Sequence, residues 1–356
     1  MTPVFEGLKV VELASVLAGP AVGMFFAELG AEVIKVENKL TGGDVTRTWK
    51  TTGEERDSDA SAYYWSINYG KKVQFLNLKD TQDYQVLVEL IKDADIVISN
   101  FRGSVANRLK LDYSSIKNIN PTIIFAELTG YPKSDRPAYD VVLQAETGFM
   151  HMTGEPNRTP VKMPVALIDI LAAHQLKEGV LVALIQQLKT GNGAHVQVNL
   201  FDTALASLAN QATNWLIAKH IPKAMGSAHP NIAPYGDVFE GRDGKMFVLA
   251  VGSDKHFESL CSCIGLSELK LDHRFRTNAD RVTNRMELIP LLAAEFAKDT
   301  AELWVDQLTK RAVPCGLIRN MKEVFDLDIA KDMLLHYPDN PNRQTVRTAV
   351  FKITYP

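Results

Sequence analysis

The stretch from Gly7 to Glu37, GLKVVELASVLAGPAVGMFFAELGAEVIKVE, decides the fold. Its first part, residues 8–15, is short, apolar and rich in β-branched residues, which is typical of a buried strand. Residues 21–30 have the apolar spacing of a helix and end in Gly30, a residue that often terminates helices. Residues 31–37 have the composition of a second strand. A strand, a helix and a strand in this order predict a parallel sheet that is covered by helices.

The same alternation continues and predicts an α/β fold with a doubly wound parallel sheet. Further strands are expected at 71–80, 95–101, 121–131 and 194–202, and helices at 81–94, 104–120, 170–189 and 203–220. The pattern of predicted elements then changes, because residues 241–245, GRDGK, are typical of a hairpin turn between two strands. We therefore expect a large α/β domain at 1–224, a smaller α+β domain at 225–325, and a C-terminal segment at 326–356 that returns to the large domain.

The composition excludes several classes of function. The chain has 356 residues, a net charge of −3 and three cysteines. It has no excess of basic residues, so neither nucleic acid nor a membrane surface is expected as a partner. It shows no signal-peptide pattern and no bilayer-spanning apolar stretch, and an odd number of cysteines argues against a disulfide framework. We expect a cytoplasmic protein. The histidines show no metal-ligand spacing, so no metal is expected.

The first strand–helix–strand unit invites comparison with dinucleotide-binding folds. Glu37 ends the second strand, where an acid that binds a ribose would lie. The turn, however, contains Ala18-Gly19-Pro20 with the next glycine at Gly23, so the G-x-G-x-x-G pattern is absent. A structural role for this unit is therefore favoured over a nicotinamide site. A serine hydrolase is also disfavoured, because the chain has no G-x-S-x-G motif.

Several basic residues follow strand ends, which is where open α/β sheets bind their ligands. They are Lys71, Lys72, Lys79, Arg102 and Arg108. Such residues are more often solvated surface charges, and their clustering near residues 99–101 only slightly favours a phosphate site.

Asp169 lies where an apolar run becomes a helix, and no charged residue follows it until Lys177. One interpretation is that it caps the helix, a common role of aspartate. The other is that it is a nucleophile, since a helix N-terminus stabilises a carboxylate and also an oxyanion that forms beside it. The residues alone leave these two interpretations equally open.

Taken in order, the motifs of this chain resemble the class III CoA-transferases, the family of formyl-CoA transferase and carnitine CoA-transferase. The resemblance covers nearly the whole chain and rests on residues 7–49 together with these segments: LNLKD (76–80), ADIVISNFRGSVANRLKLDY (94–113), NPTIIFAELTGY (120–131), PAYDVVLQAETG (137–148), LKTGNGAHVQVNLFD (188–202) and VPCGLIRNMKEV (313–324). It implies an interlocked homodimer that moves CoA from an acyl-CoA thioester to a small free carboxylic acid, with no metal.

The resemblance also implies roles for individual residues. Asp169, in ALID (166–169), matches the family's catalytic aspartate, which attacks the thioester and forms a covalent aspartyl intermediate. The positions that match the family's CoA contacts are Val16, Leu17, Asn38, Leu76, Asn77, Lys79, Asn100, Phe101, Arg102, Arg108 and Tyr139.

The chain departs from some of its relatives at these positions. Relatives often have glutamine in place of Leu17, and some have arginine in place of Asn38. The glycine-rich loop of formyl-CoA transferases has no counterpart in residues 227–236, SAHPNIAPYG. The alternative function is an α-methylacyl-CoA racemase of the same superfamily, in which a histidine stands where this chain has Tyr139. A non-catalytic nucleotide-binding module is a more distant alternative. The identities of the donor and acceptor acids are not readable from the sequence.

Overall fold

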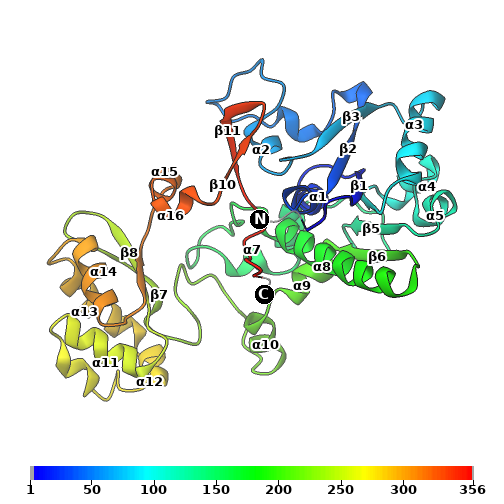
Figure 1. Cartoon of the computed structure of the whole chain (residues 1–356). Helices are drawn as coiled ribbons and strands as arrows, with labels where there is room; N and C mark the ends of the chain where they lie inside the picture. The colour runs from blue at the N-terminus through cyan, green and yellow to red at the C-terminus, as the bar shows by residue number, and fades with distance from the viewer. Residues whose placement is uncertain (1–3, 355–356) are drawn as a thin grey trace. The chain divides into compact units, whose positions relative to one another are not determined.

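The structure is a computed structural model that describes residues 4–354. Its central feature is a sheet of six parallel strands in the order β3-β2-β1-β4-β5-β6 (Figure 1). The strands are β1 (Lys9–Glu12), β2 (Glu32–Asn38), β3 (Lys72–Leu76), β4 (Ile96–Ser99), β5 (Ile124–Thr129) and β6 (Ala194–Asn199). The order reverses direction between β1 and β4, so this is the doubly wound α/β sheet that the sequence predicts.

Helices cover both faces of this sheet, as a parallel sheet requires. On one face, Val11, Val97 and Phe125 of the strands pack in one apolar cluster with Leu87 and Ile116. Those two residues belong to α3 (Thr81–Lys92) and α5 (Tyr113–Ile119). The other long helices, α1 (Ala18–Glu28) and α8 (Leu167–Thr190), pack against each other and against the strands. The shorter helices are α2 (Ala62–Trp65), α4 (Gly103–Leu109), α6 (Asp140–Glu146) and α9 (Leu200–Ala206).

Two of the predicted helices are interrupted. The helix expected at 104–120 is α4 followed by α5, because Lys110 adopts a left-handed conformation with φ 55° and ends the first helix. Asp112 then accepts a hydrogen bond from the Ser115 amide and begins the second helix. The helix expected at 203–220 is α9 followed by α10 (Asn210–Leu216), with Ala209 between them at φ 48°.

The chain divides into two compact units. The first unit takes in residues up to 148, 163–213 and 331 onward, and the second takes in 149–162 and 214–330. The second unit therefore begins before the expected boundary after residue 224, and it also includes the excursion at 149–162. The hairpin β10 (Leu334–Tyr337) and β11 (Asn340–Val346), which was not predicted, lies in the first unit, where the Tyr337 hydroxyl donates to the Trp65 carbonyl.

The second unit has its own antiparallel sheet and core. Its strands are β7 (Tyr235–Glu240), β8 (Met246–Ala250) and β9 (Cys315–Leu317), and the predicted hairpin at 241–245 joins the first two. Phe247, Phe257 and Phe296 lie in one buried cluster. The helices are α7 (Phe149–Met152), α11 (Asp254–Cys263), α12 (Asn278–Thr283), α13 (Arg285–Phe296), α14 (Ala301–Lys310), α15 (Met321–Phe325) and α16 (Asp328–Lys331). Among the residues described in both units, no helix combines the length and apolar character needed to cross a membrane.

Candidate active site

Two adjoining clefts open at the carboxyl ends of the parallel strands. They have volumes of about 480 and 490 Å³, and Ser15, Phe101 and Val105 line both of them. Ser15 lies in the loop after β1 and Phe101 in the loop after β4, the two strands between which the strand order reverses. Open α/β sheets bind ligands at this position because the loops of the two neighbouring strands diverge there. We call the two clefts the first and the second cleft.

The clefts bring together every site residue that the family resemblance names. The first cleft is lined by Asp169 together with Val16, Leu17, Asn100, Phe101, Arg102 and Tyr139. The second is lined by Asn38, Leu76, Asn77, Lys79 and Arg108, again with Phe101. Asp169 therefore lines one cleft, and Lys79 and Arg108 line the cleft that adjoins it. The ligand contacts of these residues stay predictions.

Asp169 does not cap its helix. It lies in the first turn of α8, whose N-cap position is Ala166, a residue that makes no side-chain cap. The cap comes from Asp140 of α6, whose Oδ2 accepts hydrogen bonds from the amides of Ile168 at 2.7 Å and Asp169 at 3.4 Å. Within residues 4–354, the Asp169 carboxylate itself accepts no hydrogen bond, although only 8% of the residue is exposed. The capping interpretation of Asp169 is therefore wrong.

The surroundings of Asp169 make its carboxyl group a weak acid. Burial raises the pKa of Asp169 to about 7, and the nearby Asp140 contributes in the same direction. The sequence shows no charge close to Asp169 because Asp140 reaches it from another helix. The charge of Asp169 also affects Tyr63. Burial is the larger cause and this charge the second, and together they raise the pKa of Tyr63 to about 12. Neither Asp140 nor Tyr63 was identified from the sequence.

The basic residues named from the sequence fall into two groups. Lys79 and Arg108 line the second cleft, and the described part of the chain offers neither side chain a hydrogen bond or ion pair. Lys71 instead is fully buried, with Nζ 2.8 Å from Glu12 Oε2, and Lys72 pairs with Glu32 on the surface. The phosphate-site hypothesis is therefore wrong for Lys71 and Lys72, whose charges are already neutralised within the protein.

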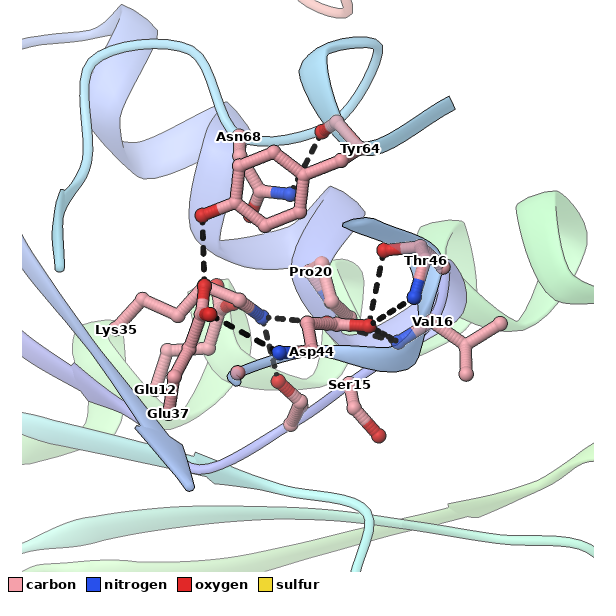
Figure 2. A network of polar contacts seen from close by, with 12 residues as sticks. Glu12, Ser15, Val16, Pro20, Lys35, Glu37, Asp44, Thr46, Tyr64 and Asn68 are labelled. Atoms are coloured by element: carbon pink, nitrogen blue, oxygen red, sulfur yellow. Dashed lines mark hydrogen bonds and ion pairs between the residues drawn. The ribbon is translucent and has the colours of Figure 1, made fainter. Parts of the chain in front are cut away.

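A buried network of charges includes residues that line the second cleft (Figure 2). Lys35 Nζ lies 2.9 Å from Glu12 Oε1 and 3.1 Å from Asp44 Oδ2. Burial opposes the charge on Lys35, but these two carboxylates outweigh it and hold the pKa of Lys35 above its ordinary value. Glu12 and Lys35 are direct partners in the register of β1 and β2. Opposite charges inside two apolar strands were the signal in the sequence that could have revealed this network.

Glu37 belongs to the same region and is not free to bind a ribose. Its Oε2 accepts a hydrogen bond from Arg47 Nε at 2.6 Å, and its Oε1 accepts one from the Tyr64 hydroxyl at 2.7 Å. The side chain is buried, so these contacts use it as a structural anchor. This geometry agrees with the structural role that the sequence favoured for the first strand–helix–strand unit.

Comparisons with known proteins agree with the motifs. The family model described as CoA-transferase family III matches residues 5–355. Succinate–glutarate CoA-transferase from Agrobacterium fabrum is 37% identical over 91% of this chain and 82% of its own length. Acetyl-CoA:oxalate CoA-transferase from Acetobacter aceti is 36% identical over 95% of this chain and 88% of its own length. The crystal structure of a CAIB/BAIF family protein from Brucella suis is 37% identical, with a TM-score of 0.85 over 99% of this chain and 93% of that one.

The resemblance seen in the sequence is thus confirmed over the length of the chain, in its motifs and in its fold. The match extends from the first strand to the C-terminal segment, and the relatives named above as CoA-transferases share this length with it. A carboxylate in one cleft and unpaired cations in the adjoining cleft suit a thioester with a phosphorylated carrier. The chain belongs to CoA-transferase family III and is a CoA-transferase.

Proposed function

We propose that this enzyme moves CoA from the acyl-CoA of one small dicarboxylic acid to another free dicarboxylic acid through intermediates on Asp169. The observation that carries the proposal is a buried carboxylate with no hydrogen-bond partner among residues 4–354, which lines a cleft next to the one that Lys79 and Arg108 line. In this proposal the nucleotide phosphates of CoA bind in the second cleft and the thioester lies in the first.

The chemistry proceeds by four substitutions at carbonyl carbons. An oxygen of the ionised Asp169 attacks the thioester carbon, the C–S bond breaks, and CoA thiolate leaves an acyl-aspartyl anhydride. The thiolate then attacks the aspartyl carbonyl, so the first acid departs and an aspartyl-CoA thioester forms. The second acid displaces the thiolate to give a new anhydride. Finally the thiolate attacks the new acyl group, which yields the product acyl-CoA and frees Asp169.

This sequence keeps one high-energy acyl bond at every stage and therefore needs no ATP. It requires Asp169 to be ionised, and a pKa of about 7 leaves a substantial fraction of the carboxylate available at neutral pH. It also requires that water be excluded, because an anhydride hydrolyses readily. The burial of Asp169 supports this exclusion.

Dicarboxylic acids are proposed as substrates because the names of the compared relatives specify succinate, glutarate and oxalate. A racemase is not favoured. The position that carries a histidine in racemases is Tyr139, and a phenol is a poorer catalyst than an imidazole for removing a proton from a weak carbon acid at neutral pH.

The test traces an oxygen atom from the acceptor acid to Asp169. The enzyme is incubated with succinyl-CoA and ¹⁸O-labelled glutarate, and both glutaryl-CoA and the peptide that contains Asp169 are analysed by mass spectrometry. The last step leaves one oxygen of the incoming acid on Asp169, so we expect glutaryl-CoA and an increase of about 2 mass units in that peptide after one turnover, rising towards about 4 after many turnovers. Glutaryl-CoA without label in the peptide would refute the aspartyl route. Lack of exchange with glutarate, oxalate and related diacids would refute the substrate class.

We also propose that the enzyme works in the cytoplasm as an interlocked homodimer. In support, Val182, Ile185 and Leu188 of α8 are exposed apolar residues at helical spacing. Threaded chains cannot part without unfolding, so light scattering should give the dimer mass down to nanomolar concentrations, and two differently tagged forms should not exchange subunits. A monomer or rapid exchange would contradict interlocking.

A further inference from the structure

Val16 has a backbone conformation that its side chain disfavours. Its φ is 72°, in the left-handed region, and it lines the first cleft with Asp169. A β-branched residue rarely adopts this region, because its side chain is strained there. Such a conformation persists only where neighbouring contacts enforce it. The residue lies in the loop between β1 and α1, so whatever enforces its conformation also determines how α1 begins.

The enforcing contact comes from Asp44. The Val16 amide donates to Asp44 Oδ2 at 3.2 Å and lies 3.4 Å from Oδ1. Ser15, the preceding residue, is held through both backbone groups, because its amide donates to Asn100 Oδ1 and its carbonyl accepts from Asn100 Nδ2. The loop is therefore fixed from two sides, by Asn100 after β4 and by Asp44 after β2.

Asp44 is itself rigidly held, as Figure 2 shows. Its carboxylate lies 3.1 Å from Lys35 Nζ, and Oδ1 accepts hydrogen bonds from the amide and the hydroxyl of Thr46 at 3.0 and 2.9 Å. Its own amide donates to Glu37 Oε2 at 3.0 Å. The side chain is almost completely buried. A buried carboxylate with this many partners has one orientation, which makes it a firm support for Val16.

The consequence concerns the two residues that follow Val16. Leu17 is the N-cap position of α1 and Ala18 its first residue, and both line the first cleft. Within residues 4–354 neither amide has an acceptor, as expected for the first turn of a helix. The same cleft holds the Asp169 carboxylate, which is buried and likewise finds no hydrogen-bond partner in that part of the chain. Free donors and a free nucleophile thus face one space.

We propose that Asp44 is a positioning residue for the CoA transfer proposed above, and the inference rests on that function. By holding Val16 in its strained conformation, Asp44 places the amides of Leu17 and Ala18 where they stabilise the negative charge that forms on the thioester oxygen during attack by Asp169. Preorganised backbone amides at a helix N-terminus are effective in this role because they need no reorganisation during the reaction. Asp44 lines the second cleft, but its carboxylate is almost completely buried and used by partners within the protein, so its proposed effect on the reaction is through Val16.

The test is a double-mutant cycle with Asp44→Asn and Val16→Gly. The side chain introduced by Asp44→Asn keeps an oxygen for Thr46 but presents an NH₂ group to the Val16 amide, so it no longer holds the loop. We expect kcat for succinyl-CoA:glutarate exchange to fall by about 10- to 100-fold, the effect of a displacement on the order of 1 Å. The dissociation constant of free CoA, measured by calorimetry, should change by less than about 3-fold, because Asp44 lines the second cleft with an almost completely buried side chain and Lys79 and Arg108 are unchanged.

Glycine adopts φ 72° without strain, so the loop of a Val16→Gly variant needs less support. We therefore expect Asp44→Asn to lower kcat less in the Val16→Gly background than in the wild-type background. Asp112→Asn is the matched control, since Asp112 caps α5 through a similar hydrogen bond away from the clefts and should leave kcat unchanged. If Asp44→Asn does not fold, Thr46→Val removes one donor from Asp44 and should lower kcat in the same direction.

Three results would overturn the inference. They are an unchanged kcat in the variant used, an equal loss of kcat in both backgrounds, and a loss of CoA affinity in parallel with kcat, which would indicate a merely structural role. A wild-type enzyme that exchanges no CoA at all would refute the proposed function, and this inference with it. An active wild type with an unimpaired Asp44→Asn variant refutes only the role of Asp44.

Discussion

Asp169→Asn should make the protein more stable at alkaline pH while it abolishes CoA transfer. The reason is that folding buries a carboxyl group that prefers to be neutral there. Burial, with the charge of Asp140, raises the pKa of Asp169 from 3.8 to about 7. A difference of about 3 in pKa corresponds to about 4 kcal/mol, at 1.36 kcal/mol for each unit. This is an upper value, because Asp169 lines a cleft and keeps a small exposed fraction.

The sign of the effect follows from proton binding. Between about pH 4 and pH 7 the folded protein holds a proton on Asp169 that the unfolded chain has released. The free energy of unfolding of the wild type therefore falls as the pH rises through this window, and the full loss is present above the folded pKa of about 7. Asparagine is neutral at every pH. The two proteins should have nearly equal stability near pH 4, and the variant should be more stable by up to about 4 kcal/mol near pH 8.5.

The assay is thermal unfolding of both proteins at pH 5 and pH 8.5, with CoA exchange measured in parallel. A gain of 1 kcal/mol raises Tm by roughly 2–4 °C for a unit of this size. Asp57→Asn is the control, since Asp57 is exposed and its replacement should not produce a pH-dependent difference. A variant that is no more stable than wild type at pH 8.5 would refute the burial argument. Full exchange activity in the variant would refute the assignment of Asp169 as the nucleophile.

Three further predictions concern the two clefts. The kcat/KM of the wild type should rise with pH through about 7 as Asp169 ionises. Asp140→Asn should shift this rise to lower pH, because it removes a negative charge near Asp169, and an unshifted profile would exclude the influence of Asp140. Arg108→Ala should raise the KM for acyl-CoA by about 10-fold or more and leave the KM for the acid unchanged. Arg56→Ala is the control, because Arg56 is exposed. An equal effect on both KM values would argue against a phosphate contact. Tyr139 stands at the position of the racemase base, so a 2-methylacyl-CoA incubated with the enzyme in D₂O should gain no deuterium at its α-carbon. Rapid deuterium uptake without CoA exchange would favour a racemase.

The fold was predictable where local pattern and packing agree. The stretch 7–37 contains two apolar strands and an apolar helix, and the structure has β1, α1 and all of β2 except its last residue within it. The breaks between α4 and α5 and between α9 and α10 were missed, since Lys110 and Ala209 adopt left-handed conformations that their residue types do not signal. The hairpin β10–β11 was missed because it depends on contacts such as that between Tyr337 and Trp65, which are far apart in sequence.

The sequence placed the candidate residues in space but not their electrostatics. The residues named from the motifs line the two clefts, since loops after neighbouring parallel strands lie side by side, and their binding roles stay predictions. The sequence did not reveal that Lys71 forms a buried ion pair with Glu12 or that Asp140 caps α8. These relations are made between elements that only the folded chain brings together. Charge state and hydrogen-bond satisfaction therefore require the structure, although residue identity does not.

The neighbouring carboxylates Asp140 and Asp169 show how one helix end supports two different roles. Asp140 accepts the amides of Ile168 and Asp169 as well as the side-chain amide of Gln144, so its charge is satisfied by donors and its position is fixed. Asp169 receives no donor among the described residues, and its pKa is about 7 because burial and Asp140 oppose its charge. A nucleophile needs an oxygen that no hydrogen bond occupies and a pKa close to the working pH. The cap therefore does more than begin α8, because Asp140 takes the free amides and leaves the carboxylate of Asp169, the proposed nucleophile, without a donor.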